Sequence, residues 1–278
     1  MQTWFITGAS SGLGEGIARH ALASGMQVVL TARDKSRVEA LAGAYPSTAL
    51  AVAFDLTNEE SMCSAVQAAE ERFGHIDVLV NNAGHGYRAA IEESDDAAVA
   101  ELFQANFFGP MKLARMVLPG MRERRAGTIV NVTSVGAVRG ALGNGYYSAA
   151  KGALELASEA LAKEVEHLGI RVMLVEPGAL RTGFYGERLG ATTRTIADYD
   201  ELAARYRKTD ATDSGDQPGD PDRAGELVVQ TLLGEHGELP QRLLLGNDCV
   251  AASRATLAAR LEELEAWAPV AAQADFGA

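Results

Sequence analysis

Residues 3–14 read Thr3-Trp-Phe-Ile-Thr-Gly-Ala-Ser-Ser-Gly-Leu-Gly14. The apolar run Thr3–Thr7 predicts a short buried strand, and the residues from Gly14 onward have the apolar spacing of a helix. Three glycines, at positions 8, 12 and 14, separate the two elements and permit a tight turn that a pyrophosphate can approach at the helix N-terminus. A nucleotide-binding turn is favoured because it joins a first strand to a first helix, although a tight turn without a ligand would use the same glycines.

The alternation of strand and helix continues to about residue 182. Buried strands are predicted at Thr3–Thr7, Gln27–Ala32, Ala49–Phe54, Val78–Asn81, Gly127–Val132 and Arg171–Val175. Helices are predicted at Gly14–Ser24, Asp34–Ala44, Glu59–Phe73 and Ala98–Met121. Alternating β and α units form a parallel sheet with right-handed crossovers. The sequence therefore predicts an α/β fold with a doubly wound parallel sheet of the Rossmann type.

The composition changes after Thr182. Residues 183–222 are polar and acidic, contain Gly and Pro, and have no regular apolar spacing. A structureless stretch of this length is usually a lid or a disordered segment, and we expect a substrate lid here. A helix at Arg223–Leu233, a strand at Arg242–Leu245 and a helix at Asp248–Trp267 follow. We expect one domain over residues 1–278, with 183–222 as its lid and 242–278 as a C-terminal strand, helix and tail.

Composition and charge exclude several classes of function. The 278 residues have a formal net charge of −12 and no long basic run, so nucleic acid is not an expected partner. Cys63 and Cys249 lie far apart without neighbouring His ligands, so neither a disulfide nor a metal site is expected. The N-terminus lacks the pattern of a signal peptide, and no apolar run reaches the roughly 18 residues of a membrane span. We expect a cytoplasmic protein that does not enter membranes.

Tyr147 and Lys151 lie four residues apart in the stretch Gly143-Asn-Gly-Tyr-Tyr-Ser-Ala-Ala-Lys151. On a helix this spacing places both side chains on one face. An ammonium group roughly 4 Å from a phenol favours the ionised phenol by at most on the order of 4 kcal/mol, so it lowers the pKa of the tyrosine toward neutrality. The pair therefore indicates an acid/base tyrosine, and a surface tyrosine beside a solvated lysine is the alternative.

Further candidate residues follow the predicted strands, at the sheet edge where open α/β sheets bind ligands. Arg33 comes after Ala32, where a carboxylate would favour a free ribose, and can pair with a ribose 2′-phosphate; a solvated arginine is the alternative. Asp55, before Leu56, is either an acceptor for the adenine amino group or an acid at a helix N-terminus. The stretch Asn81-Asn-Ala-Gly84 combines amides that brace a strand with small residues that let a cofactor pass.

Three more positions place polar groups near the expected site. Ser134 ends the fifth strand thirteen residues before Tyr147, where its hydroxyl can hold a substrate oxygen. Asn106 is an amide in an apolar helical stretch, so it either has structural partners or belongs to a water relay. Pro177-Gly178, with Thr182 beyond, suits a turn beneath a nicotinamide ring.

Taken together, the glycine-rich turn, Asn-Asn-Ala-Gly, Asn106, Ser134, Tyr-x-x-x-Lys and Pro-Gly resemble the motifs of the short-chain dehydrogenase/reductase family, in family order across residues 3–182. The resemblance implies that Tyr147 is the catalytic acid/base, that Lys151 binds the nicotinamide ribose and lowers the tyrosine pKa, and that Ser134 orients the substrate oxygen. It assigns Asn106 to the lysine-linked water of a proton relay. The cofactor-binding set is expected to be Gly8, Ser10, Ser11, Gly12, Leu13, Gly14, Arg33, Asp55, Leu56, Asn82, Ala83, Gly84, Tyr147, Lys151, Pro177, Gly178, Leu180 and Thr182.

The stretches Asn81-Asn-Ala-Gly-His-Gly-Tyr87, Asn106-Phe-Phe-Gly-Pro110 and Val175-Glu-Pro-Gly178 resemble the branch of the family that contains hydroxysteroid and retinol dehydrogenases. The resemblance implies hydride transfer between a nicotinamide cofactor and a secondary alcohol, ketone or aldehyde, in a homodimer or homotetramer. We expect NADP to be preferred to NAD. Epimerisation or dehydration on the same scaffold, and nucleotide sensing without turnover, are the alternatives.

Residues around the expected substrate site are less informative. Apolar side chains in the lid and near the tyrosine suggest a mainly apolar substrate; they are Phe184, Tyr185, Val135 and Leu142. His85 and Tyr87 follow the fourth strand, and we interpret them as loop residues, with pocket lining as the alternative.

Overall fold

The computed structural model describes residues 1–186, 188–203, 205–207 and 215–276. Its centre is a seven-stranded sheet in the order β3-β2-β1-β4-β6-β7-β9, in which all neighbouring strands are parallel. The strands are β1 (Thr3–Ile6), β2 (Gln27–Ala32), β3 (Ala49–Ala53), β4 (Val78–Asn81), β6 (Gly127–Val132), β7 (Ile170–Pro177) and β9 (Arg242–Leu245). The strand order reverses between β1 and β4, which confirms the doubly wound fold that the sequence predicts.

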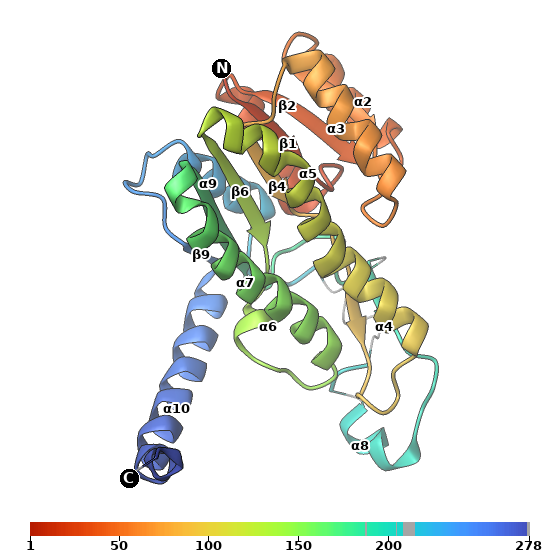
Figure 1. Ribbon diagram of the computed structural model, residues 1–278. Helices are drawn as coiled ribbons and strands as arrows, with labels where there is room; N and C mark the ends of the chain where they lie inside the picture. Colours follow the sequence, from red (N-terminus) through yellow and green to blue (C-terminus); the bar gives the residue numbers. More distant parts are fainter. Residues whose placement is uncertain (187, 204, 208–214, 277–278) are drawn as a thin grey trace.

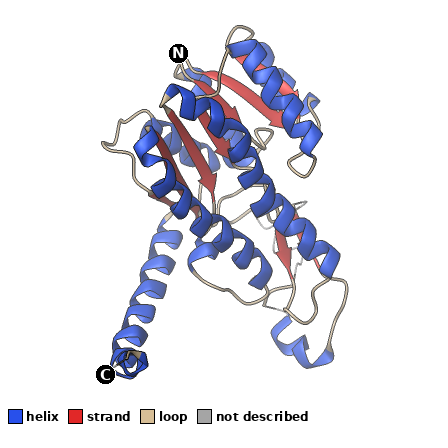
Figure 2. Cartoon of the chain, in the orientation of Figure 1, coloured by secondary structure: helices blue, strands red, loops and turns tan. Residues whose placement is uncertain are grey.

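Helices cover both faces of this sheet (Figures 1 and 2). One face packs on α1 (Gly12–Ala23), α2 (Ser36–Ala44) and α9 (Pro221–Leu232), and the other on α3 (Glu59–Phe73), α5 (Gly109–Arg124) and α7 (Gly145–Val165). Alternate strand residues supply the two cores, because successive side chains point to opposite faces. In β1, Trp4 and Ile6 belong to the first core and Phe5 to the second. This explains why the strands are apolar throughout.

Helices α1 and α9 approach so closely that their backbones touch. A Cβ atom at Gly225 would lie 2.4 Å from the carbonyl carbon of Gly16, and one at Gly16 would lie 2.7 Å from the carbonyl oxygen of Pro221. Only glycine fits at Gly16 and Gly225 in this packing. Helix α9 therefore packs directly on the helix that follows the glycine-rich turn.

The predicted helix Ala98–Met121 is wrong in one respect, because a π-helical segment divides it. α4 (Asp96–Phe103) leads into the π-helical residues Gln104–Phe108, and α5 follows. The amide of Gly109 donates to the carbonyl of Gln104, five residues back. Pro110 has no amide to give to the carbonyl of Asn106, which an α-helix would require. The bulge places Asn106 in the interior, fully buried.

Segment 183–222 is not structureless where it is described. β8 (Leu189–Ala191) pairs in parallel with β5 (Gly86–Arg88) in a separate two-stranded sheet, and a 3₁₀ turn (Ala197–Tyr199) and α8 (Asp200–Ala203) follow. Residues 187, 204 and 208–214 of the predicted lid lie outside the described residues. The expectation of a structureless stretch is wrong for the described part of this segment, because tertiary contacts, and not local patterns, order that part.

The buried carboxylate of Glu93 provides the main polar contacts of this segment. Its Oε1 accepts hydrogen bonds from the amide of Ile196 (3.0 Å) and from Arg207 (2.7 Å), and its Oε2 accepts one from the hydroxyl of Tyr206 (2.9 Å). These bonds hold the pKa of Glu93 below its usual range even though burial alone would raise it. A charged, fully bonded carboxylate thus ties segment 183–222 to the loop before α4.

The C-terminal helix α10 (Asn247–Ala271) projects away from the body of the molecule and ends near the C-terminus (Figure 1). It extends beyond the predicted Asp248–Trp267, and its buried residues, Cys249 and Ser253, lie at its base. Among the described residues, no helix combines the length and the hydropathy that would let it cross a membrane.

Candidate active site

Two adjoining cavities lie beyond the carboxyl ends of the strands. The larger, of about 590 Å³, extends from the end of β2 past the ends of β3 and β4. The smaller, of about 330 Å³, lies beyond β6 and β7 and beside the start of α7. Gly84 and Arg188 line both, so the cavities are continuous at this point. This is the sheet edge at which the sequence predicts a ligand.

The glycine-rich turn forms one wall between these cavities. Gly12 has a φ of +60°, a backbone conformation that residues with a Cβ atom rarely adopt. Ser11 is the N-cap of α1. Asn82 braces the turn from the next strand, since its amide nitrogen donates to the carbonyl of Thr7 at 2.9 Å. The hydroxyl of Thr7 in turn accepts from the backbone amides of Asn82 and Ala83, both at 2.9 Å. The predicted amide bracing is present.

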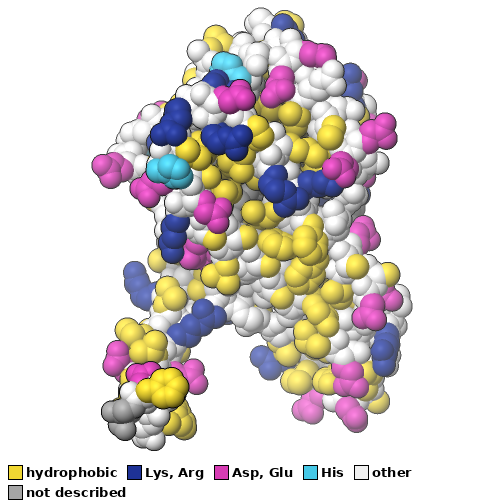
Figure 3. All heavy atoms as spheres, in the orientation of Figure 1, with side chains coloured by type: hydrophobic (Ala, Val, Ile, Leu, Met, Phe, Trp, Pro, Cys, Tyr) yellow, Lys and Arg dark blue, Asp and Glu magenta, His cyan; other side chains and the backbone are white. Residues whose placement is uncertain are grey.

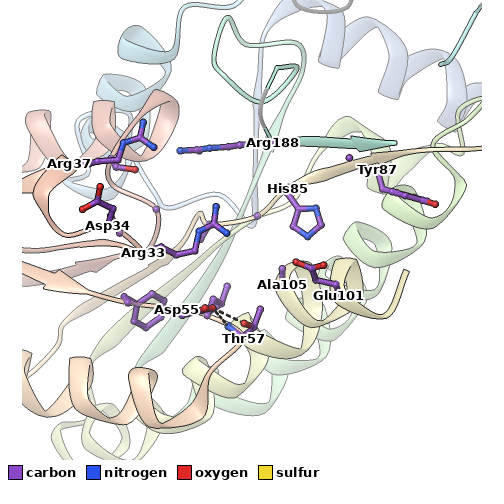
Figure 4. A pocket seen from close by; sticks show the side chains of 18 of the residues that line it. Arg33, Asp34, Arg37, Asp55, Thr57, His85, Tyr87, Glu101, Ala105 and Arg188 are labelled. Atoms are coloured by element: carbon purple, nitrogen blue, oxygen red, sulfur yellow. Dashed lines mark hydrogen bonds between the residues drawn. The ribbon is translucent and has the colours of Figure 1, made fainter. Parts of the chain in front are cut away.

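Three arginines direct their guanidinium groups toward the larger cavity: Arg33, Arg37 and Arg188 (Figure 4). Arg33 follows β2 as the sequence predicts. Asp34, which also lines this cavity, accepts hydrogen bonds from the amide and hydroxyl of Ser36 at 3.0 and 2.7 Å, which lower its pKa. Arg33 and Arg37 outnumber the ionised Asp34 on the cavity wall next to β2, so this wall has a net positive charge and suits an anion.

Asp55 also lines the larger cavity, but its carboxylate has a local partner. Its Oδ1 accepts from the amide and the hydroxyl of Thr57 at 2.8 and 2.7 Å (Figure 4). This arrangement favours the structural alternative for Asp55, a carboxylate that holds the turn before α3.

Tyr147 and Lys151 lie in the first two turns of α7, and both are buried and line the smaller cavity. The ring of Tyr147 packs edge-on against Phe184, with centroids 5.7 Å apart. The Nζ atom of Lys151 donates to the carbonyl of Val132, at the end of β6, at 2.9 Å. The predicted common face of the helix is confirmed, and it points into the cavity.

The electrostatics of this pair differ from the sequence expectation. Burial raises the pKa of Tyr147 to about 12, and the groups that oppose this rise are Ser134, through a side-chain hydrogen bond, and the charge of Arg88. Burial lowers the pKa of Lys151 to about 8. The prediction that Lys151 brings the tyrosine toward neutrality is therefore wrong for the protein alone: desolvation dominates, and the lysine is directed at the carbonyl of Val132.

Ser134 and Asn106 take up different positions relative to the cavities. Ser134 lines the smaller cavity and caps α6 (Val135–Val138), accepting from the amide of Gly136 at 3.0 Å. Asn106 lines neither: its amide nitrogen donates to the carbonyl of His85 at 2.8 Å, and its oxygen accepts from the amide of His85 at 3.1 Å. A Cβ built on Gly84 would lie 2.4 Å from Asn106 Oδ1 and 3.5 Å from Lys151 Nζ. Asn106 and the ammonium of Lys151 therefore both lie next to Gly84, and Asn106 lies behind the residues that line the cavity.

The structure brings nearly the whole predicted set together. The larger cavity is lined by the predicted Gly8, Ser10, Arg33, Asp55, Leu56, Ala83 and Gly84. The smaller is lined by Ser11, Gly12, Leu13, Asn82, Gly84, Ser134, Tyr147, Lys151, Pro177, Gly178, Leu180 and Thr182. Of the predicted residues, Gly14 and Asn106 are not among those that line the cavities.

A sequence model of the family described as short chain dehydrogenase matches residues 2–190, well over half of the chain. This chain is a short-chain dehydrogenase. Oxidoreductase BOA17 of Botryotinia fuckeliana is 36% identical to it over 89% of each chain. Retinol dehydrogenase 8 of Homo sapiens is 40% identical over 68% of this chain and 62% of that protein. The predicted resemblance and the assignment as an oxidoreductase enzyme are confirmed.

Solved structures agree with this assignment. A short-chain dehydrogenase from Streptomyces avermitilis superposes with a TM-score of 0.89, at 39% identity, over 99% of this chain and 100% of that one. An alcohol dehydrogenase from Thermococcus sibiricus, complexed with 5-hydroxy-NADP, has a TM-score of 0.72 at 26% identity, covering 88% and 96%. A 3-ketoacyl-(acyl-carrier-protein) reductase from Brucella melitensis, complexed with NADH, has a TM-score of 0.72 at 29% identity, covering 89% and 97%.

Sequence reasoning missed several residues of this short-chain dehydrogenase site. Arg37 lies in the first turn of α2, and Arg188 lies in the polar segment 183–222. Neither residue belongs to a recognisable sequence motif. Arg88 also lines the smaller cavity, with its backbone paired to β8. Burial lowers the pKa of the Arg88 guanidinium. Only the placement of β5 against β8 brings Arg88 and Arg188 into the site.

The smaller cavity of the short-chain dehydrogenase is lined in part by apolar side chains. Phe184, Tyr185 and Val135 line the smaller cavity as predicted, whereas Leu142 is 46% exposed and does not. His85 and Tyr87 line the larger cavity, which favours the alternative of pocket lining over the interpretation as loop residues. Among the described residues, no group of three or more His, Cys, Asp and Glu side chains is arranged to hold a metal ion.

Proposed function

We propose that this chain is an NADP-preferring oxidoreductase that interconverts a secondary alcohol and a ketone, or reduces an aldehyde. One observation carries the proposal: Ser134, Tyr147 and Lys151 line one cavity. That cavity joins a second one with a cationic wall. The arrangement suits a carbonyl substrate next to a phosphorylated dinucleotide.

The residues present fit such a cofactor. Arg33 and Arg37 would hold a ribose 2′-phosphate, the start of α1 and Arg188 would hold the pyrophosphate, and Lys151 would bind the nicotinamide ribose. When bound, the nicotinamide supplies or accepts the hydride. Neighbouring structures carrying 5-hydroxy-NADP and NADH show that related folds hold either cofactor. The two arginines beside β2 support the preference for NADP, with NAD as a weaker alternative.

Ser134 and Tyr147 would act on the substrate oxygen. Both hydroxyls would hydrogen-bond to it, and Tyr147 would exchange the proton. Because burial raises the pKa of Tyr147 to about 12, the tyrosine is protonated at neutral pH and ready to act as the acid in carbonyl reduction. The oxidation direction requires the tyrosinate and is therefore expected to favour high pH. Asn106 would support Lys151 through a water.

We further propose that residues 1–278 act as one domain whose segment 183–222 covers a mainly apolar substrate. Phe184 and Tyr185 support this, since their rings form part of the cavity wall. A mobile lid excludes water and positions the substrate. Hydrogen exchange of residues 189–203 with and without cofactor and substrate tests the proposal, and equal protection in both states contradicts it. The predicted cytoplasmic location fits a small-molecule enzyme of this kind.

The test of the proposed chemistry is Tyr147→Phe, with Tyr146→Phe as the matched control. Loss of the phenolic proton is expected to reduce turnover by roughly 10² to 10⁴-fold while cofactor affinity stays unchanged. Tyr146 lines neither cavity and is expected to tolerate the same change better. Steady-state rates on a panel of ketones, aldehydes and alcohols, together with cofactor binding, decide the matter. A Tyr147→Phe enzyme that keeps more than about a tenth of the rate contradicts the role.

The same panel separates the alternatives. Epimerisation or dehydration would give product without net change in cofactor absorbance. A nucleotide-sensing protein would bind cofactor and turn over nothing, and it has no use for Ser134, Tyr147 and Lys151 arranged around a cavity.

A further inference from the structure

Helix α10 carries a row of apolar side chains that nothing in the described chain covers. Leu257, Leu261 and Leu264 are 56, 58 and 60% exposed. Their spacing of four and three residues places them on one stripe of the helix. Figure 3 shows apolar and acidic side chains together on the projecting part of the molecule that Figure 1 labels α10.

This stripe is not explained by contacts with the body of the protein. The main contacts of α10 are with α6 and β9, next to its base, where Cys249 and Ser253 are buried. From Leu257 to the end of the helix every side chain is exposed, including Trp267 at 62%. Soluble proteins rarely expose a contiguous apolar row of this kind unless a partner covers it. In proteins, most of the stability of a helix comes from packing of its apolar face and not from helix propensity.

The charges on α10 are arranged to complement a second copy running in the opposite direction. Arg254 and Glu265 are eleven residues apart, which is three turns, so they lie on the same flank of the stripe. In an antiparallel pair the same flanks of the two helices face each other. A two-fold axis between residues 259 and 260 then sets Arg254 of each copy opposite Glu265 of the other, and sets Leu257 near Leu261.

Other occupants fit less well. A parallel pair would bring opposite flanks of the two helices together, so Arg254 of one copy would not meet Glu265 of the other. Helices that lie on membrane surfaces carry Lys and Arg on their polar face, whereas the distal half of α10 carries Glu262, Glu263 and Glu265. The projection of α10 places the two bodies at opposite ends of an antiparallel pair (Figure 1).

We propose that α10 is a self-association surface, on which two copies of this chain pair through antiparallel C-terminal helices with Leu257, Leu261 and Leu264 at the centre. The interface is isologous, so every contact occurs twice. Leu257, Leu261 and Leu264 line neither cavity, and the proposed assembly does not depend on the proposed chemistry.

The first test is the solution mass of Leu261→Glu, measured by light scattering after gel filtration. Position 261 meets water in the isolated chain, so the variant folds, and its melting curve and cofactor binding check this. We expect it to weaken self-association at least about 100-fold, because two leucine contacts are lost by symmetry. It should therefore have half the wild-type mass. Ala259→Glu adds the same charge to the opposite face of α10 and keeps the wild-type mass.

A charge exchange tests the antiparallel register. Arg254→Glu and Glu265→Arg each place like charges opposite one another and weaken association, and the double variant restores it. A wild-type chain that is monomeric overturns the proposal, as does an assembly that Leu261→Glu leaves intact. A double variant no better than the single ones overturns the antiparallel register. Sedimentation of the wild type, but not of Leu261→Glu, with anionic vesicles would identify a membrane surface instead.

Discussion

The guanidinium of Arg188 donates a hydrogen bond of 2.6 Å to the hydroxyl of Ser11, which caps α1 in the glycine-rich turn. The two residues are 177 positions apart in the chain. Arg188 precedes β8, so its position depends on the pairing of β8 with β5. Segment 183–222 thus reaches back over the turn at which a pyrophosphate would bind, and it brings a fixed positive charge there.

Arg188→Met is expected to weaken the binding of NADPH and NADH alike, by about 10 to 150-fold, the range that a charge-assisted hydrogen bond supplies. Both cofactors have the same pyrophosphate, so the loss does not discriminate between them. Fluorescence titration of each reduced cofactor measures this. Arg194→Met, at an exposed position of the same segment that does not line either cavity, serves as the control. Unchanged affinity for both cofactors would place the pyrophosphate away from Arg188.

Arg33→Ala and Arg37→Ala should discriminate where Arg188→Met does not. Each removes a guanidinium from the wall next to β2, so NADPH binding should weaken by about 10 to 150-fold while NADH binding stays nearly unchanged. Lys35→Ala removes a neighbouring cation that is paired with Glu39 and does not line the cavity, and it should leave both affinities as they are. A wild-type enzyme that prefers NADH, or an arginine variant that loses both cofactors equally, would show that the 2′-phosphate is not recognised here.

Arg88→Met is expected to shift the pH dependence of alcohol oxidation upward. The charge of Arg88 lowers the pKa of Tyr147, so its removal raises that pKa further. Oxidation requires the deprotonated tyrosine, and its rate rises with pH through the tyrosine pKa. The rising limb of the rate, measured with saturating cofactor, should therefore move to higher pH. Arg139→Met removes a cation from the same cavity that does not act on Tyr147, and its profile should match the wild type. Identical profiles for all three enzymes would refute the effect of Arg88.

Glu176→Gln should stabilise the protein above neutral pH. Burial, with the negative charge of Glu155 added, raises the pKa of the Glu176 carboxyl from 4.5 to about 7. The folded state then binds more protons than the unfolded state between these values, so stability is greatest at low pH and is lost as pH rises through 7. Gln lacks this loss, which is worth about 1–3 kcal/mol at pH 8.

The measurement is the difference in unfolding free energy between Glu176→Gln and the wild type at several pH values. This difference in unfolding free energy should be small at pH 5 and should favour Glu176→Gln at pH 8. Glu164→Gln, on the exposed face of α7, should show no such trend. A difference that does not change with pH would mean that Glu176 is ionised at every pH value measured.

Local patterns were sufficient to predict the strands, the glycine-rich turn and the common face of Tyr147 and Lys151. Each of these depends on residues close in sequence: a short apolar run, glycines between a strand and a helix, and a spacing of four residues. The segments β5 and β8 have three residues each and lie about a hundred positions apart, so neither has a periodic signal of its own. Their pairing, and with it the positions of Arg88 and Arg188, follows from tertiary contacts alone.

The tyrosine pKa shows a second kind of limit. The sequence spacing correctly placed Tyr147 and Lys151 on one face of a helix, but it gave no measure of how much water the fold removes from both. In the structure burial raises the pKa of Tyr147 and lowers that of Lys151, and the lysine ammonium is directed at the carbonyl of Val132. Glu93 is a similar case, because a lone acid in a loop gives no sign that it will be buried with three donors.

The contact between Gly16 and Gly225 also determines when the packing of α1 can be completed during synthesis of the chain. Helix α1 leaves the ribosome early, yet the surface of it that meets α9 stays exposed to solvent until more than two hundred further residues have been translated. A nascent chain can form the first strands in that interval, but it cannot complete the packing behind the glycine-rich turn. A ligand that binds this turn would therefore recognise finished chains and not growing ones.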